Sequence, residues 1–149
     1  MYQNLRKVQF AYEQNEVMNL SPVQITEHLY KALGKCLRSA REGLLEGNPA
    51  RKGENIGRAI SILGELRASL DLEGGGKIAA NLNALYAYLT SELTMANLRN
   101  DQKRLHDAIT TVDPLIEAWS QVAEQEGGKI KFGINQDVQD QPMAVHATF

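Results

Sequence analysis

Four long stretches of the chain repeat apolar residues at the spacing of an α-helix, and this pattern constrains the fold more than any other feature. In each stretch apolar residues recur every three or four positions, which places them on one side of a helix. The four apolar stripes cover residues 25–44, 56–70, 78–93 and 105–123. Helices of this length joined by short loops are expected to pack as an antiparallel four-helix bundle, so the predicted fold class is all-α.

Residues that start and stop helices mark both ends of the first stretch. Ser21 and Gln24 form the pattern of a capping box, and Pro22 stands at the first helical position between them. Gly47 is expected to end this helix in the left-handed conformation, and Pro49 cannot extend it.

Similar signals bound the other helices. The second is expected to begin near Arg51 and to end at the glycine run of residues 74–76, and the third to cover residues 77–96. Asn100 and Asp101 are expected to cap the fourth helix.

The fourth helix contains a proline. Because Pro114 lacks a backbone N–H, it predicts either a kink or a fresh helix start capped by Asp113. This helix is expected to end before Gly127-Gly128.

One domain flanked by two arms is the expected organisation, since 149 residues suit a single core. Residues 1–20 form an N-terminal arm or short helix, residues 21–126 the bundle, and residues 127–149 a mobile C-terminal tail. Both arms hold more apolar residues than a solvated tail would. They either complete the core or cover an apolar groove from which a partner displaces them.

Charge and hydropathy exclude several classes of protein. With 16 Lys and Arg against 18 Asp and Glu, the net charge is −2, which argues against nucleic-acid binding through a basic surface. No apolar run reaches the roughly 18 residues of a membrane span, and the N-terminus lacks the apolar core of a secretory signal. A cytoplasmic protein without membrane insertion is therefore expected. Its one cysteine, Cys36, is expected to be a buried thiol.

No pattern of catalytic or metal-binding residues accompanies the helices. A di-iron bundle needs Glu three residues before His, whereas Ile25, Lys103 and Met143 stand at those positions. The glycine run before Lys77 follows a helix and lacks the Ser or Thr of a phosphate-binding loop. The sequence therefore predicts no enzyme, no metal and no cofactor.

Glycines inside the predicted helices point instead to surfaces. Gly34, Gly43, Gly57 and Gly64 each cost up to about 1 kcal/mol relative to alanine. They either let helices of the bundle approach closely or form a shallow channel for another chain. Gly57 and Gly64 are seven residues apart and share one helical face.

In order and spacing, a series of short motifs resembles the flagellar secretion chaperones for flagellin, the FliS family. In chain order the motifs are Ser21-Pro22, Leu29-Tyr30, Ala59–Leu66, Ser69-Leu70-Asp71, Gly75–Leu82, Leu85–Tyr88, Ala96–Asp101 and Glu117-Ala118-Trp119. The family's Leu-Tyr-Asp-Tyr pattern reads Leu85-Tyr86-Ala87-Tyr88 here and lacks its acid. The resemblance covers residues 1–122.

The resemblance implies a non-enzymatic export chaperone with an antiparallel helical bundle. Such a chaperone binds the disordered C-terminal region of flagellin, which becomes helical as it wraps around the bundle. It prevents premature polymerisation and helps to deliver flagellin to a component of the flagellar type III export gate. A disordered segment suits this role because wide burial offsets its ordering entropy.

Candidate client-binding residues follow from the resemblance and from the helical stripes. Family members use an aromatic residue upstream of Ser-Pro, which implies Phe10 or Tyr12 here. The N-terminal arm is expected to compete with the client for an apolar groove. The remaining candidates lie in the bundle: Leu29, Leu33, Gly57, Gly64, Tyr86, Leu89 and Leu93. The alternative function is a helical adaptor without a flagellin client, whose arms form a weak homodimer.

Overall fold

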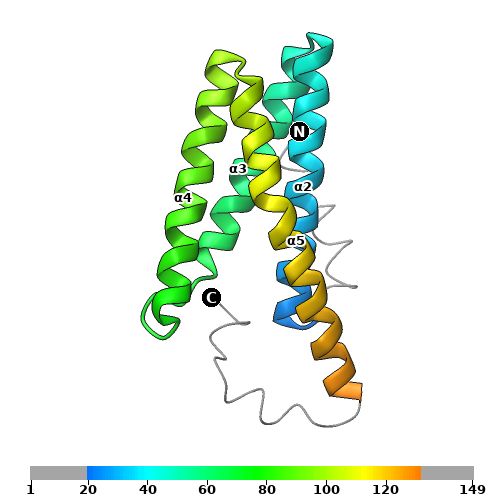
Figure 1. Cartoon of the computed structure of the whole chain (residues 1–149), viewed down its shortest axis with the longest axis vertical. Coiled ribbons are helices and arrows are strands. Elements are labelled where there is room, and N and C mark those ends of the chain that lie inside the picture. Colours follow the sequence, from blue (N-terminus) through cyan, green and yellow to red (C-terminus); the bar gives the residue numbers. More distant parts are fainter. Residues whose placement is uncertain (1–19, 132–149) are drawn as a thin grey trace, which may run out of the picture.

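The computed structural model describes residues 20–131, which form four α-helices and, within that range, no strand. The helices are α2 (Pro22–Glu46), α3 (Pro49–Ala68), α4 (Gly76–Arg99) and α5 (Gln102–Lys131). Successive helices run in opposite directions and are joined by short turns (Figure 1). Helix α2 packs mainly against α3 and α5, and α4 packs against the same two helices. The predicted antiparallel four-helix bundle is confirmed, with the α3–α4 edge opposite the α2–α5 edge.

The predicted limits of α2 are confirmed in detail. The Ser21 hydroxyl accepts a hydrogen bond from the backbone N–H of Gln24 at 3.1 Å, and the Gln24 side chain accepts one from the Ser21 N–H at 2.9 Å. Gly47 ends the helix in the left-handed conformation, with φ 70°. Helix α3 begins at Pro49, slightly before the expected residue, because the Asn48 side chain caps it by accepting from the backbone N–H of Arg51 at 3.1 Å.

A buried lysine joins the first turn of α3 to the end of α4. The Lys52 side chain is 7% exposed, and its ammonium donates to the backbone carbonyl of Asn97 at 2.9 Å and to the side chain of Asn100. Asn100 is itself left-handed, with φ 51°, and ends α4. A cation at a helix C-terminus is favourable because the last carbonyls carry partial negative charge. Lys52 therefore holds this corner of the bundle together.

Helix α5 excludes one of the two alternatives expected at Pro114 and ends later than expected. It runs through Pro114 as one α-helix, so no fresh start occurs there. The carboxylate of Asp113 accepts a hydrogen bond from Arg38 of α2 at 2.7 Å and is therefore not used as a cap. The helix also continues past Gly127-Gly128 to Lys131, beyond the expected end at residue 126. The remainder of the predicted tail lies outside the described residues.

The core lies between the four helices and comes mainly from the predicted stripes. Leucine, isoleucine, valine and alanine supply most of it, as expected. Its largest fully buried aliphatic side chains are Leu33, Leu37, Ile56, Leu63, Leu66, Leu89, Leu93 and Leu105. Cys36 is half-buried against this core, and burial raises the pKa of its thiol.

Candidate functional site

A surface with few charged side chains lies along the outer line where α3 meets α4. Two contacts set the register of these antiparallel helices. The Arg67 guanidinium donates to the Asn83 side chain at 2.7 Å, and Gly53 lies beside Asn97. Residues seven apart lie on one side of a helix, so the same line passes between Ile60 and Thr90. We call this surface the α3–α4 face and define it by Gly53, Gly57, Ile60, Gly64, Asn83, Ala87, Thr90 and Thr94.

The polar groups of the α3–α4 face are largely satisfied within the chain. The hydroxyl of Thr90 donates to the backbone carbonyl of Tyr86 at 2.8 Å, and that of Thr94 donates to the carbonyl of Thr90 at 2.8 Å. Asn83 accepts from Arg67, as described above. Covering the face would therefore leave few polar groups unpaired, which keeps the cost of removing water low.

Glycines in the bundle fall into two groups. A Cβ atom at Gly43 would lie 2.7 Å from the backbone nitrogen of Lys52, and one at Gly34 would lie 2.7 Å from the Ile116 side chain. Close helix approach therefore explains these two. At Gly57 and Gly64 a Cβ would meet nothing within 4 Å, and both residues are exposed. Packing within the described residues does not explain why these helical positions lack a side chain.

Charge is scarce on the α4 side of this surface. Between Lys77 and Glu92 the helix has no ionisable side chain except two tyrosines. Large apolar groups are nonetheless exposed along α4: Ile78 at 52%, Tyr88 at 55% and Leu98 at 73%. A partly exposed helical segment of this length without charges is unusual and is typical of a surface that a partner covers.

An aromatic cluster ties α2, α4 and α5 together inside the bundle. The hydroxyl oxygens of Tyr30 and Tyr86 lie 2.5 Å apart and share a buried hydrogen bond. The Tyr30 ring stacks on Trp119, with 6.0 Å between the ring centroids. Burial raises the pKa of both phenols. These groups therefore remain neutral and structural at ordinary pH.

Comparison with known proteins decides the family. Residues 4–126, well over half of the chain, match the family model described as the flagellar protein FliS. The chain belongs to the FliS family. It is 39% identical over 111 residues to the flagellar secretion chaperone FliS of Salmonella typhimurium, covering 74% of this chain and 82% of the relative. The FliS chaperones of Vibrio cholerae and Bacillus subtilis are 35% and 31% identical, over 68% and 78% of this chain and 75% and 86% of theirs.

Membership of the FliS family settles the broad class of activity. The family consists of chaperones, so the chain is an export chaperone of a flagellar secretion system and not an enzyme. No described helix is both long and apolar enough to cross a membrane.

Several predicted client-binding residues of this FliS-family chain lie in the core. Leu33, Tyr86, Leu89 and Leu93 are all at most 2% exposed, so they offer no surface to a client in this conformation. Their helical spacing matches that of the leucines that hold the helices together. These four positions are therefore corrected to core residues.

The other candidates have different surroundings. Leu29 is half-buried and packs against the edge of the core. Gly57 and Gly64 are exposed and lie together on the α3–α4 face. Phe10 and Tyr12 lie outside the described residues.

Sequence reasoning missed an exposed apolar end of this FliS-family bundle. Ile25, Ile78 and Val122 continue the apolar stripes of their helices, and the sequence therefore predicts that they are buried. They are instead 36%, 52% and 41% exposed. At the end where α2 begins, α2 and α5 lie apart from α3 and α4 (Figure 1), so the stripes extend beyond the region where the helices cover each other.

Proposed function

We propose that the chain is a cytoplasmic export chaperone that binds the disordered C-terminal region of flagellin. The client becomes helical on the α3–α4 face and so cannot polymerise before export. The complex then meets a component of the flagellar export gate. The open, side-chain-free positions at Gly57 and Gly64 carry this proposal, because nothing within the described residues explains them.

The chemistry of the α3–α4 face suits a docked amphipathic helix. Glycines let the backbone of a second helix approach closely, and Ile60, half-buried between them, provides an apolar contact. Charge is scarce here, so an apolar helix face would meet few ions that must lose their water; Arg67, bonded to Asn83, is the one described above. A disordered client that folds on this face offsets its ordering entropy by wide burial.

The N-terminal arm has an apolar surface within reach. Leu20 stands immediately before the capping box of α2, at the end of the bundle where Ile25, Ile78 and Val122 are exposed. Tyr12 precedes Leu20 by eight positions, an extended reach of up to about 28 Å. We infer that Phe10 and Tyr12 cover this apolar end and that the client competes with them for it.

Calorimetric titration with a flagellin C-terminal peptide tests the proposal. The full-length chain should form an equimolar complex, and Gly64→Leu should weaken it about tenfold or more because leucine occupies the space of the docked helix. Ala118→Leu introduces the same side chain at an exposed position of α5 and should leave the affinity unchanged. Phe10→Ala and Tyr12→Ala should alter client affinity without lowering the melting temperature.

Three outcomes would contradict this function. Absence of a stable complex would remove flagellin as the client. If light scattering also showed a dimer that the peptide does not change, the homodimeric adaptor would be the better account. A Gly64→Leu variant that binds normally would place the client on another face.

A further inference from the structure

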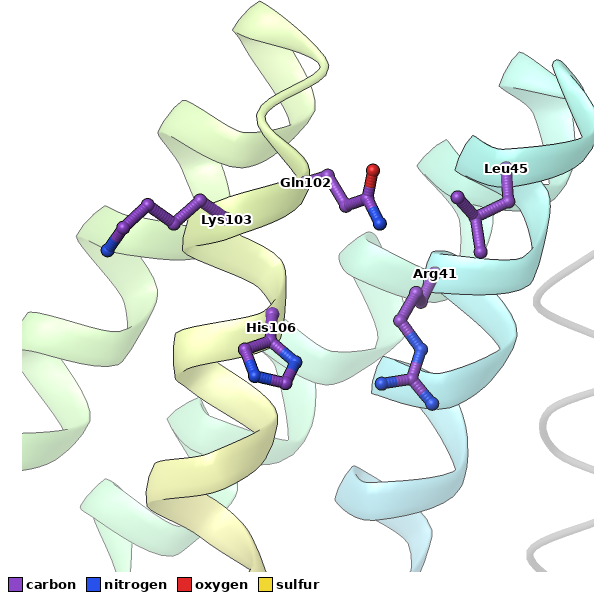
Figure 2. Close-up of a pocket in the computed structure, with 5 residues that line it drawn as sticks. All are labelled: Arg41, Leu45, Gln102, Lys103 and His106. Carbon is purple, nitrogen blue, oxygen red and sulfur yellow. The ribbon is translucent and has the colours of Figure 1, made fainter.

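A second surface lies on the opposite edge of the bundle, between α2 and α5. It is a shallow gap, wide open to solvent, at the end of the bundle where α2 finishes and α5 begins. Arg41, Leu45, Gln102, Lys103 and His106 line it (Figure 2). Because α2 and α5 form the edge opposite α3 and α4, this gap is separate from the α3–α4 face.

The side chains at the gap are rich in hydrogen-bond donors. The Arg41 guanidinium and the His106 imidazole extend toward each other from α2 and α5, and the Gln102 amide lies above them (Figure 2). Lys103 extends away from the gap, and its ammonium pairs with Asp107 at 2.9 Å. None of the five lining residues is acidic. A carboxylate entering the gap would meet donors from both helices.

Further along the bundle from the gap, α2 and α5 make two other polar contacts, with which the position of Arg41 can be compared. The Ser120 hydroxyl donates to the Glu27 carboxylate at 2.8 Å, and Arg38 pairs with Asp113 at 2.7 Å. At both of these levels a carboxylate completes the contact between α2 and α5. One turn further along α2, Arg41 faces His106 instead.

Arg41 also differs from the other half-buried arginines. Arg51 pairs with Glu46 at 3.0 Å, and Arg104 pairs with Asp101 at 3.1 Å. Arg41 is half-buried, but its side chain has no hydrogen bond or ion pair with the side chains described, which end at residue 126. A guanidinium without an anion has its donors available to bind one, and its flat fork of donors matches a carboxylate.

We propose that this gap is a second docking surface, which binds a carboxylate-bearing segment of another protein. Arg41 holds a carboxylate of the partner, and Gln102 and His106 donate further hydrogen bonds. Leu45, which is 61% exposed beside them, provides an apolar contact. The open shape admits a peptide chain. Because the chain has a net charge of −2, its overall charge does not attract an acidic peptide, so binding would have to come from the local donors of the gap.

Fluorescence anisotropy with a labelled peptide of repeated Glu-Leu-Asp triplets tests this inference on the full-length chain. The acidic peptide should bind, and its Gln-Leu-Asn counterpart should not. Arg41→Gln should weaken binding about tenfold. Arg58→Gln removes an exposed cation from α3, away from the gap, and should change the affinity little.

A second variant supplies the carboxylate from within the chain. Gln102→Glu is nearly isosteric and places an acid beside Arg41, so it should abolish peptide binding while leaving the fold intact. Gln125→Glu makes the same change at an exposed position near the other end of α5 and serves as the control. Melting curves establish that all variants are folded.

Three results would overturn the inference. The first is that the acidic peptide does not bind at low salt. The second is that Arg41→Gln and Arg58→Gln lose equal affinity for it. The third is that Gln102→Glu binds it fully. The inference does not depend on flagellin, since Gly64→Leu tests the client face and leaves this gap unchanged.

Discussion

At the scale of single residues, the bundle depends on a few polar groups whose partners come from distant parts of the chain. The phenols of Tyr30 and Tyr86 satisfy each other in a core that is otherwise mainly aliphatic. From the first turn of α3, Lys52 donates to the Asn97 carbonyl in the last turn of α4. A buried polar group without its partner costs roughly 1–3 kcal/mol, so each pair also disfavours other packings of the same helices.

The tyrosine pair gives a prediction about stability. Tyr30→Phe should lower the free energy of unfolding by about 1–3 kcal/mol, because it leaves the Tyr86 hydroxyl buried without its partner. Tyr86→Phe should cost less, because the Tyr30 hydroxyl also has a hydrogen bond with the Trp119 side chain. The double variant should lose clearly less than the sum of the two single losses. Urea unfolding of all four proteins measures this coupling, and strictly additive losses would show that the hydroxyls do not depend on each other.

At the scale of helices, the sequence predicts features that neighbouring residues determine and misses those that tertiary contacts determine. The start and end of α2 were predictable because Ser21, Gln24 and Gly47 act within four residues of the helix ends. The choice between a kink and a fresh start at Pro114 was not, because the side chain of Asp113, the expected cap, bonds to Arg38, 75 positions away. Neighbouring residues determine where a helix ends, whereas a residue on another helix can bind the side chain that would have capped it.

The same division explains the candidate site. Helical spacing placed Gly57 and Gly64 on one face correctly, but it could not distinguish them from Gly43, whose neighbour comes from another helix. It also could not separate Tyr86, a core residue, from a binding residue, because its hydroxyl partner lies 56 positions away. The exposed ends of the stripes depend on where helices diverge, which only the assembled bundle shows.

Helix α3 provides a prediction that separates stability from function. Gly57→Ala should raise the free energy of unfolding by up to about 1 kcal/mol, because alanine favours the helix and its Cβ meets open space. Thermal or urea unfolding measures the gain. Gly43→Ala is the matched control and should destabilise by about 1 kcal/mol or more, since the backbone of Lys52 cannot move aside. A loss of stability in Gly57→Ala would mean that the position is packed after all.

At the scale of the whole molecule, the order of the helices places the two proposed surfaces on opposite edges. Helices α3 and α4 form the α3–α4 face, where we propose that the client binds, and α2 and α5 form the gap around Arg41. The core between them is packed with fully buried leucines and contains the Tyr30–Tyr86 pair. Coupling between distant sites requires an element with two arrangements that both ligands influence. A single closely packed core provides no such element.

The two ligands should therefore bind together and independently. Saturating the chain with the flagellin C-terminal peptide should leave the dissociation constant of the Glu-Leu-Asp peptide within about twofold, which corresponds to a coupling free energy below about 0.5 kcal/mol. Anisotropy of the labelled acidic peptide, with and without the client peptide, measures this. The Gly64→Leu variant is the control, because it weakens the client and should not alter the acidic peptide. Mutual exclusion would mean that the client extends around the bundle to Arg41, and a chaperone loaded with its client could not then use this gap to meet another partner.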